Sequence, residues 1–180
     1  LEDLATALHG LGIEIVASSG TGARIEAAGV PWIPVEQVTG APEMLGGRVK
    51  TLHPGIHGGI LARRDVPEDL ARLAELGIAE IGLVVVNLYP FRETVAEPGI
   101  TDAEAIEKID VGGPAMVRAA AKNHRAVGVV TSPTRYPEVI AELRERDGAL
   151  SDETRRRLAA EAFAMTVLSR SKNAARTPEW

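Results

Sequence analysis

Two apolar, β-branched runs constrain the fold of this chain more than any other feature. Residues 81–90 (IGLVVVNLYP) and 126–132 (AVGVVTS) lack the polar alternation of a strand that faces water on one side. Strands of this kind are typical of a sheet that helices cover on both faces. Helical patterns lie between and around the two runs, so strands and helices alternate along the chain. This order predicts an α/β fold with a mainly parallel central sheet and helices on both faces.

The other elements follow from apolar spacing and from the positions of glycine and proline. Further strands are expected at residues 13–18 and, interrupted by Pro34, at 32–38. Ser151 is expected to cap the last helix. The predicted helices cover residues 1–11, 23–29, 67–77, 102–109, 114–123, 136–148 and 151–168.

Length and composition exclude several classes of protein. The 180 residues fit one domain with a hydrophobic core. A net charge of -5, with only 3% aromatic residues, argues against a nucleic-acid or anionic-membrane surface. The chain has no cysteine, which excludes disulfides and thiolate metal sites. We find neither an apolar run long enough to cross a bilayer nor a signal peptide, so a cytoplasmic location is expected.

A glycine-rich, basic segment, residues 46–59 (GGRVKTLHPGIHGG), lies between the predicted strands. Its proline and its paired glycines disfavour a helix, so we expect a loop. Arg48 and Lys50 are two residues apart, and in an extended segment their side chains point to the same side. Together with the hydroxyl of Thr51, they predict an anion-binding site. A solvated basic loop is the alternative.

The same segment holds two histidines, His53 and His57, at the spacing of two zinc ligands on a helix. We expect no helix here, and no third histidine or carboxylate lies nearby in the sequence. The sequence therefore predicts no metal site.

Ligands bind at the carboxyl ends of the strands in parallel sheets of this kind, so the loops at those ends are candidate sites. Residues 18–22 (SSGTG) follow a strand and open a helix. Ser18, Gly20 and Thr21 there predict a phosphate site at a helix N-terminus. A helix cap with turn glycines is the alternative.

Asn87 and Tyr89 follow the most apolar strand and are predicted to lie at the same ligand end of the sheet. For the tyrosine, a core position with a satisfied hydroxyl is the commoner situation, and this alternative stays open.

Residues 110–115 (DVGGPA) precede another predicted helix, with Pro114 expected at its first position and free N–H groups in front of it. Asp110 is either a functional carboxylate or a helix cap. Lys122 falls near the end of the same helix, ~12 Å from its start at about 1.5 Å per residue. Spacing alone does not bring Asp110 and Lys122 together.

These motifs occur in a family-specific order. Residues 17–21 (ASSGT), 47–65 (GRVKTLHPGIHGGILARRD), 84–91 (VVVNLYPF) and 109–123 (IDVGGPAMVRAAAKN) together resemble the N-terminal domain of a bifunctional purine-biosynthesis enzyme, AICAR transformylase/IMP cyclohydrolase. The resemblance implies a three-layer, Rossmann-like fold of the methylglyoxal-synthase type. It covers residues 1 to about 163, and residues 1–180 are expected to form one such domain. The family's first strand with its phosphate loop, and its transformylase domain, are expected to be absent.

The resemblance implies an activity and its residues. The activity is ring closure of 5-formamidoimidazole-4-carboxamide ribotide (FAICAR) to IMP with loss of water. The positions that match the family's catalytic residues are Lys50, Tyr89, Asp110 and Lys122. We assign Lys50 and Tyr89 to the formyl oxygen, and Asp110 and Lys122 to the amide. The positions that match its nucleotide-binding residues are Ser18, Gly20, Thr21, Arg48, Thr51, Asn87, Val111, Gly112 and Gly113.

The resemblance also implies the ligands. The partner is a small nucleotide, FAICAR or IMP, and neither nucleic acid nor membrane is expected; a homodimer stays open. The cyclohydrolase step needs no metal and no cofactor, whereas 10-formyltetrahydrofolate would serve the transformylase domain. Two alternatives remain, a regulatory module of the same fold that binds a phosphorylated effector and, ranked last, methylglyoxal synthase.

Overall fold

Four short strands form two parallel pairs in the computed structural model, which describes residues 1–87, 101–107 and 109–173. In the first pair, β1 (Val16–Ala17) lies beside β2 (Ile33–Pro34), with Val16 opposite Ile33. In the second, β3 (Leu83–Val85) lies beside β4 (Gly128–Val130), with Leu83 opposite Gly128. At least one helix lies between the two strands of each pair along the chain, as is usual for connections between parallel strands.

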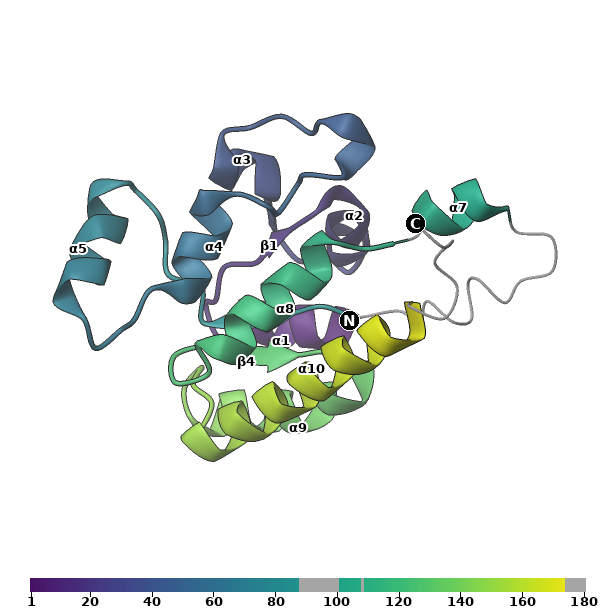
Figure 1. The fold of residues 1–180 in the computed structure, drawn as a ribbon. Helices are drawn as coiled ribbons and strands as arrows, with labels where there is room; N and C mark the ends of the chain where they lie inside the picture. Colours follow the sequence, from purple (N-terminus) through teal and green to yellow (C-terminus); the bar gives the residue numbers. More distant parts are fainter. Residues whose placement is uncertain (88–100, 108, 174–180) are drawn as a thin grey trace.

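Helices surround these strands, and together they form the α/β fold that the sequence predicts (Figure 1). The helix α8 runs through the middle of the molecule and packs against α10, α4 and both strands of the second pair. Helix α5 lies on the outer side of α4 in Figure 1, with its buried Leu73 close to Gly58 of α4. The helices are α1 (Glu2–Gly10), α2 (Ser19–Ala27), α3 (Val35–Thr39), α4 (Pro54–Leu61), α5 (Pro67–Glu75), α7 (Asp102–Glu107), α8 (Gly112–Lys122), α9 (Tyr136–Glu145) and α10 (Asp152–Asn173), with 3-10 turns η1 (Leu45–Gly47) and η2 (Pro133–Arg135).

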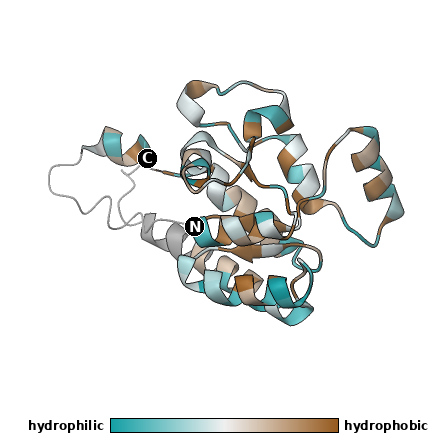
Figure 2. Cartoon of the chain, turned by 180° about the vertical axis from the view of Figure 1, so that it is seen from behind, coloured by the Kyte–Doolittle hydropathy of each residue, from teal (hydrophilic) through white to brown (hydrophobic). Residues whose placement is uncertain are grey.

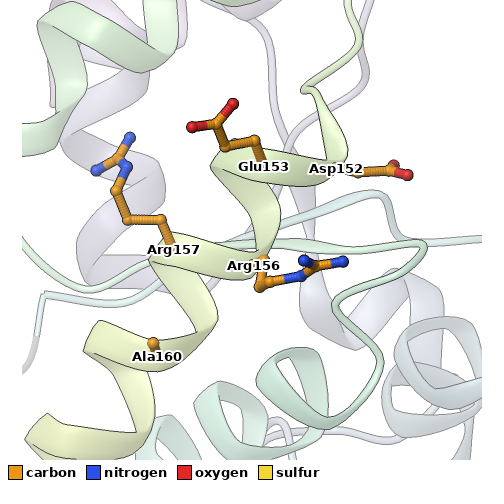
Figure 3. A pocket seen from close by; sticks show the side chains of 5 residues that line it. All are labelled: Asp152, Glu153, Arg156, Arg157 and Ala160. Carbon is orange, nitrogen blue, oxygen red and sulfur yellow. The ribbon is translucent and has the colours of Figure 1, made fainter.

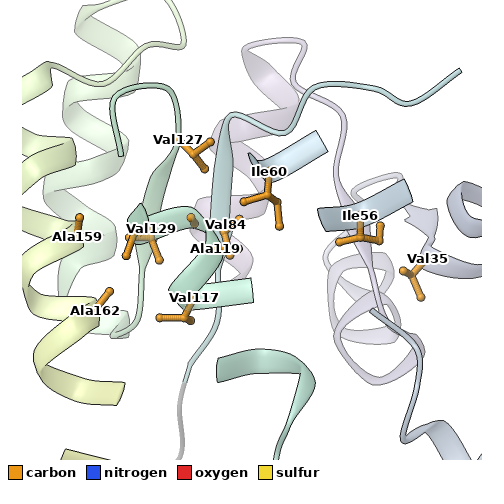
Figure 4. Close-up of a cluster of buried hydrophobic side chains, with 12 residues drawn as sticks. Val35, Ile56, Ile60, Val84, Val117, Ala119, Val127, Val129, Ala159 and Ala162 are labelled. Atoms are coloured by element: carbon orange, nitrogen blue, oxygen red, sulfur yellow. The ribbon is translucent and has the colours of Figure 1, made fainter. Parts of the chain in front are cut away.

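The largest hydrophobic cluster joins α4, α8 and α10 to the second strand pair (Figure 4). Val117 of α8 and Val129 of β4 are completely buried in it. A second cluster packs α1 and α9 against the other side of β4. Full burial of one such side chain stabilises a fold by about 1.5–3 kcal/mol. The strands inside the molecule are hydrophobic, whereas the outer helix faces are mostly hydrophilic (Figure 2).

The prediction that residues 46–59 contain no helix is wrong, because α4 begins at Pro54. A proline at the first helical position has no N–H to lose there. His53 caps the helix, and its Nδ1 accepts a hydrogen bond from the Gly55 N–H at 3.0 Å. Gly59 faces the carbonyl oxygen of Ala79, which a Cβ would approach to 2.4 Å. Close backbone packing thus compensates for the low helix propensity of glycine.

Three other predicted boundaries shift. The segment predicted as a strand at 32–38 contains only β2, because helix α3 begins at Val35. The loop at 18–22 is largely the first turn of α2, which begins at Ser19 instead of near residue 23. Helix α8 begins at Gly112, so Pro114 occupies its third position rather than its first. The N–H groups of the whole first turn lack helical partners, so proline is tolerated there as well.

The expected cap of the last helix is confirmed. Ser151 precedes α10, and its Oγ accepts a hydrogen bond from the Thr154 N–H at 3.2 Å. In the part of the chain that the structure describes, no helix is long and apolar enough to cross a membrane.

Candidate functional site

The start of α8 is the structural centre of the candidate site. Asp110 precedes it, and its Oδ1 accepts a hydrogen bond from the Gly113 N–H at 3.0 Å. A Cβ on Gly113 would lie 2.1 Å from Asp110 Oδ2 and 3.0 Å from Cγ1 of Val86, at the end of β3. Only glycine therefore lets the carboxylate and the strand end approach the helix this closely. Asp110 does act as a cap, and the carboxylate stays exposed at the helix start.

The glycine-rich segment reaches the same place through Thr51. A Cβ on Gly112 would lie 2.7 Å from Thr51 Oγ1, so the hydroxyl packs directly against the first residue of α8. The positive end of the helix dipole at such a start favours an anion, while the Gly113 and Ala115 N–H groups of the first turn already bond to Asp110 and to the Val111 carbonyl oxygen. The structure thus brings Thr51, Asp110, Gly112 and Gly113 together.

Both cations of the predicted anion site form ion pairs. Arg48 pairs with Glu107 of α7, and both side chains are largely exposed. Lys50 Nζ lies 2.7 Å from Glu43 Oε2, and the lysine side chain is only 22% exposed. Sequence reasoning did not find these two carboxylates. Residue type and spacing in the sequence do not indicate that these carboxylates pair with the two cations. Glu43 lies across the turn η1 from Lys50, and Glu107 lies on α7.

Asn87 is held at the end of β3 by a residue of α9. The buried Tyr136 donates a hydrogen bond from its hydroxyl to Asn87 Oδ1 at 2.8 Å. Burial raises the pKa of Tyr136. The phenol therefore stays protonated at neutral pH and can keep donating. Tyr136 was also missed from the sequence, whereas Tyr89, which was predicted, lies outside the described residues.

The remaining predicted residues belong to the start of α2 and to the two ends of α8. Ser18, Gly20 and Thr21 follow β1 of the first strand pair, where Ser18 is the N-cap residue of α2 in an extended conformation. Val111 precedes α8 and is exposed. Lys122 is exposed at the far end of α8, which has 11 residues. At about 1.5 Å per residue, ~15 Å of helix separates it from Gly112.

The two histidines do not form a pair of ligands on one helix face. His53 lies outside the helix as its cap, with Nδ1 engaged by Gly55. His57 lies inside α4, and its Nε2 is buried without a hydrogen-bond partner. Among residues 1–87, 101–107 and 109–173, no group of three or more histidines and carboxylates could hold a metal ion.

A separate surface hollow lies on α10 (Figure 3). One helix supplies all five lining residues, and Arg157 in it already pairs with Glu138 at 3.0 Å. None of the predicted site residues contributes. The lining residues are Asp152, Glu153, Arg156, Arg157 and Ala160.

Comparison with known protein families identifies the domain. The family model described as "MGS-like domain" matches residues 1–115. The chain belongs to the MGS-like domain family. A second model, "AICARFT/IMPCHase bienzyme", matches residues 120–169 of this chain. The resemblance and the fold class predicted from the motifs are confirmed.

Curated relatives agree with this assignment. The chain is 55% identical over 165 residues to "Bifunctional purine biosynthesis protein PurH" of Neisseria meningitidis serogroup A, and the match covers 92% of this chain and 31% of the relative. It is 57% identical over 167 residues to the protein of the same name from Desulfitobacterium hafniense strain DCB-2, covering 93% of this chain and 32% of the relative. The chain thus spans about a third of the length of these relatives.

A solved structure has the same fold. The crystal structure of ForH superposes with a TM-score of 0.86 at 39% sequence identity. The match covers 96% of this chain and 90% of ForH.

Proposed function

We propose that this MGS-like domain is an IMP cyclohydrolase that acts in de novo purine biosynthesis as part of a bifunctional enzyme. The observation that carries the proposal is the start of α8, where the positive end of the helix dipole, the Thr51 hydroxyl and the Asp110 carboxylate lie together. The similarity to PurH proteins supports the same activity. The substrate, FAICAR, carries a phosphate, a formamide and a carboxamide.

The reaction needs proton transfer and charge stabilisation. The carboxamide nitrogen attacks the formyl carbon of the same molecule. This nitrogen and the formamide nitrogen each lose one proton, and the formyl oxygen takes up both and leaves as water. Because both groups belong to one substrate, holding them in near-attack geometry lowers much of the barrier. A cation beside the formyl oxygen stabilises the oxyanion, and a carboxylate beside the amide accepts a proton.

We assign these roles to residues of the site. Lys50 and Tyr89 serve the formyl oxygen, and Asp110 serves the amide. Arg48, Thr51 and the positive end of the α8 dipole hold the nucleotide, with Asn87 at the adjacent strand end. The assignment of Lys122 to the amide rests on the resemblance alone, because a ligand held at the start of α8 lies about three helical turns from it.

The decisive experiment supplies FAICAR to the purified protein and follows IMP formation by absorbance. We expect turnover in the wild type and at least ~100-fold slower turnover in Lys50→Met, the range for a lost electrostatic or proton-transfer group. IMP binding without any turnover would overturn the proposal and favour an effector-binding module. Normal turnover in a folded Lys50→Met protein would remove Lys50 from the mechanism.

A further inference from the structure

The turn between Glu43 and Lys50 has an unusual backbone. Three consecutive residues have positive φ angles, Leu45 at 52°, Gly46 at 62° and Gly47 at 87°. For leucine this conformation costs roughly 1–2 kcal/mol. The chain therefore reverses tightly here, and it does so at an energetic cost that the surrounding contacts must compensate.

The ion pair between Glu43 and Lys50 packs onto this turn. A Cβ on Gly47 would lie 2.6 Å from Lys50 Cε, 3.1 Å from Glu43 Oε1 and 3.2 Å from Lys50 Nζ. The lysine side chain thus folds back over the bare α-carbon of Gly47 and meets the carboxylate there, instead of extending into solvent. Its low exposure of 22% agrees with this arrangement.

This ion pair is less exposed than the pair of Arg72 and Glu75 on α5. In the pair of Arg72 and Glu75 on α5, both side chains are more than 60% exposed, and such pairs contribute little. The pair of Glu43 and Lys50 instead fixes a flexible side chain against a backbone surface that only glycine leaves open. Lys50 also directly precedes Thr51, which packs against the start of α8.

We infer that Glu43 is a positioning residue for Lys50: its carboxylate holds the ammonium group over Gly47, at the edge of the site at the start of α8. This inference rests on the proposed function, because the positioned ammonium is the one that would meet the formyl oxygen. A carboxylate that merely competed with the substrate for Lys50 would instead weaken nucleotide binding and leave turnover unchanged.

The test compares Glu43→Gln with the wild type. Glutamine keeps the shape of the side chain and removes its charge. We expect kcat to fall about tenfold and KM and the Kd for IMP to change less than twofold, since misplacing a catalytic group affects the transition state more than ground-state binding. The matched control is Glu75→Gln, which breaks an exposed ion pair and should leave both constants unchanged. In a Lys50→Met background, Glu43→Gln should have no further effect on kcat, because the group that Glu43 positions is gone.

A second measurement separates this inference from the proposed function. The Lys50 Cε resonance, assigned by its loss in Lys50→Met, should report restricted side-chain motion in the wild type and free motion in Glu43→Gln. If the wild type forms no IMP, the proposed function fails, and the resonance alone decides the inference. Unchanged motion, an unchanged kcat, tighter IMP binding at normal kcat, or an undiminished effect of Glu43→Gln in the Lys50→Met background would each overturn the inference.

Discussion

The side chain of Asp69, in α5, forms hydrogen bonds to Arg63 in the segment that joins α4 to α5. Its Oδ2 accepts hydrogen bonds from the Arg63 N–H at 2.9 Å and from Arg63 Nε at 2.8 Å, and its Oδ1 accepts one from an Arg63 terminal nitrogen at 2.9 Å. These bonds to the Arg63 side chain and backbone lower the pKa of Asp69 to about 2.

The lowered pKa predicts an acid-sensitive contact. A carboxyl with a depressed folded pKa stabilises the fold above its unfolded pKa, roughly 3.9, and this contribution is lost as the pH falls toward 2. We expect the Asp69 carboxyl to titrate with a midpoint near 2 in a carbon NMR experiment, and at a higher pH in Arg63→Gln, which removes the side-chain bonds but keeps the backbone N–H of residue 63. A midpoint near 4 in the wild type would contradict the hydrogen bonds.

At the scale of elements, α4 carries two adjacent glycines in different environments. A Cβ on Gly59 would lie 2.4 Å from the Ala79 carbonyl oxygen, whereas on Gly58 its nearest neighbour would be Ile78 Cδ1 at 3.5 Å, an ordinary contact. Gly59→Ala should therefore lower the free energy of unfolding by about 1–3 kcal/mol, as overpacking does. Gly58→Ala is the matched control and should raise it slightly, since alanine is favoured in helices by up to ~1 kcal/mol. Thermal unfolding measures both, and equal effects would refute the packing argument.

The same helix shows what sequence patterns can and cannot predict. Apolar periodicity and capping residues predicted α1, α5, α9 and α10, because these depend on local signals. They missed α4, because the advantage of glycine at position 59 comes from a backbone oxygen distant in sequence. In the site, the motifs singled out the residues at the start of α8. They missed the partners Glu43, Glu107 and Tyr136, because a contact across a turn or between helices leaves no local pattern.

At the scale of the whole molecule, two segments far apart in the sequence form the candidate site. Thr51 comes from the glycine-rich segment, while Gly112 and Gly113 come from α8, which the hydrophobic cluster fixes against α4 and α10. A ligand that bridges these segments should stabilise the entire fold. If the site binds a nucleotide monophosphate, IMP at 100 times its Kd should add ~2.7 kcal/mol to the free energy of unfolding.

A substitution of Arg48 is expected to change nucleotide binding without changing the stability of the free protein. Its side chain is 61% exposed and pairs with an equally exposed Glu107, so Arg48→Ala should leave the melting temperature of the free protein nearly unchanged. The same change removes a charge-assisted contact to the phosphate and should weaken the IMP-dependent thermal shift. Arg72→Ala on α5 is the matched control, because that arginine has a similar exposed ion pair away from the site and should retain the full shift. Inorganic phosphate should stabilise the protein much less than IMP, since it lacks the base and ribose contacts near Asp110. If millimolar IMP shifts the melting temperature of the wild type no more than phosphate does, then the start of α8 is not a nucleotide site.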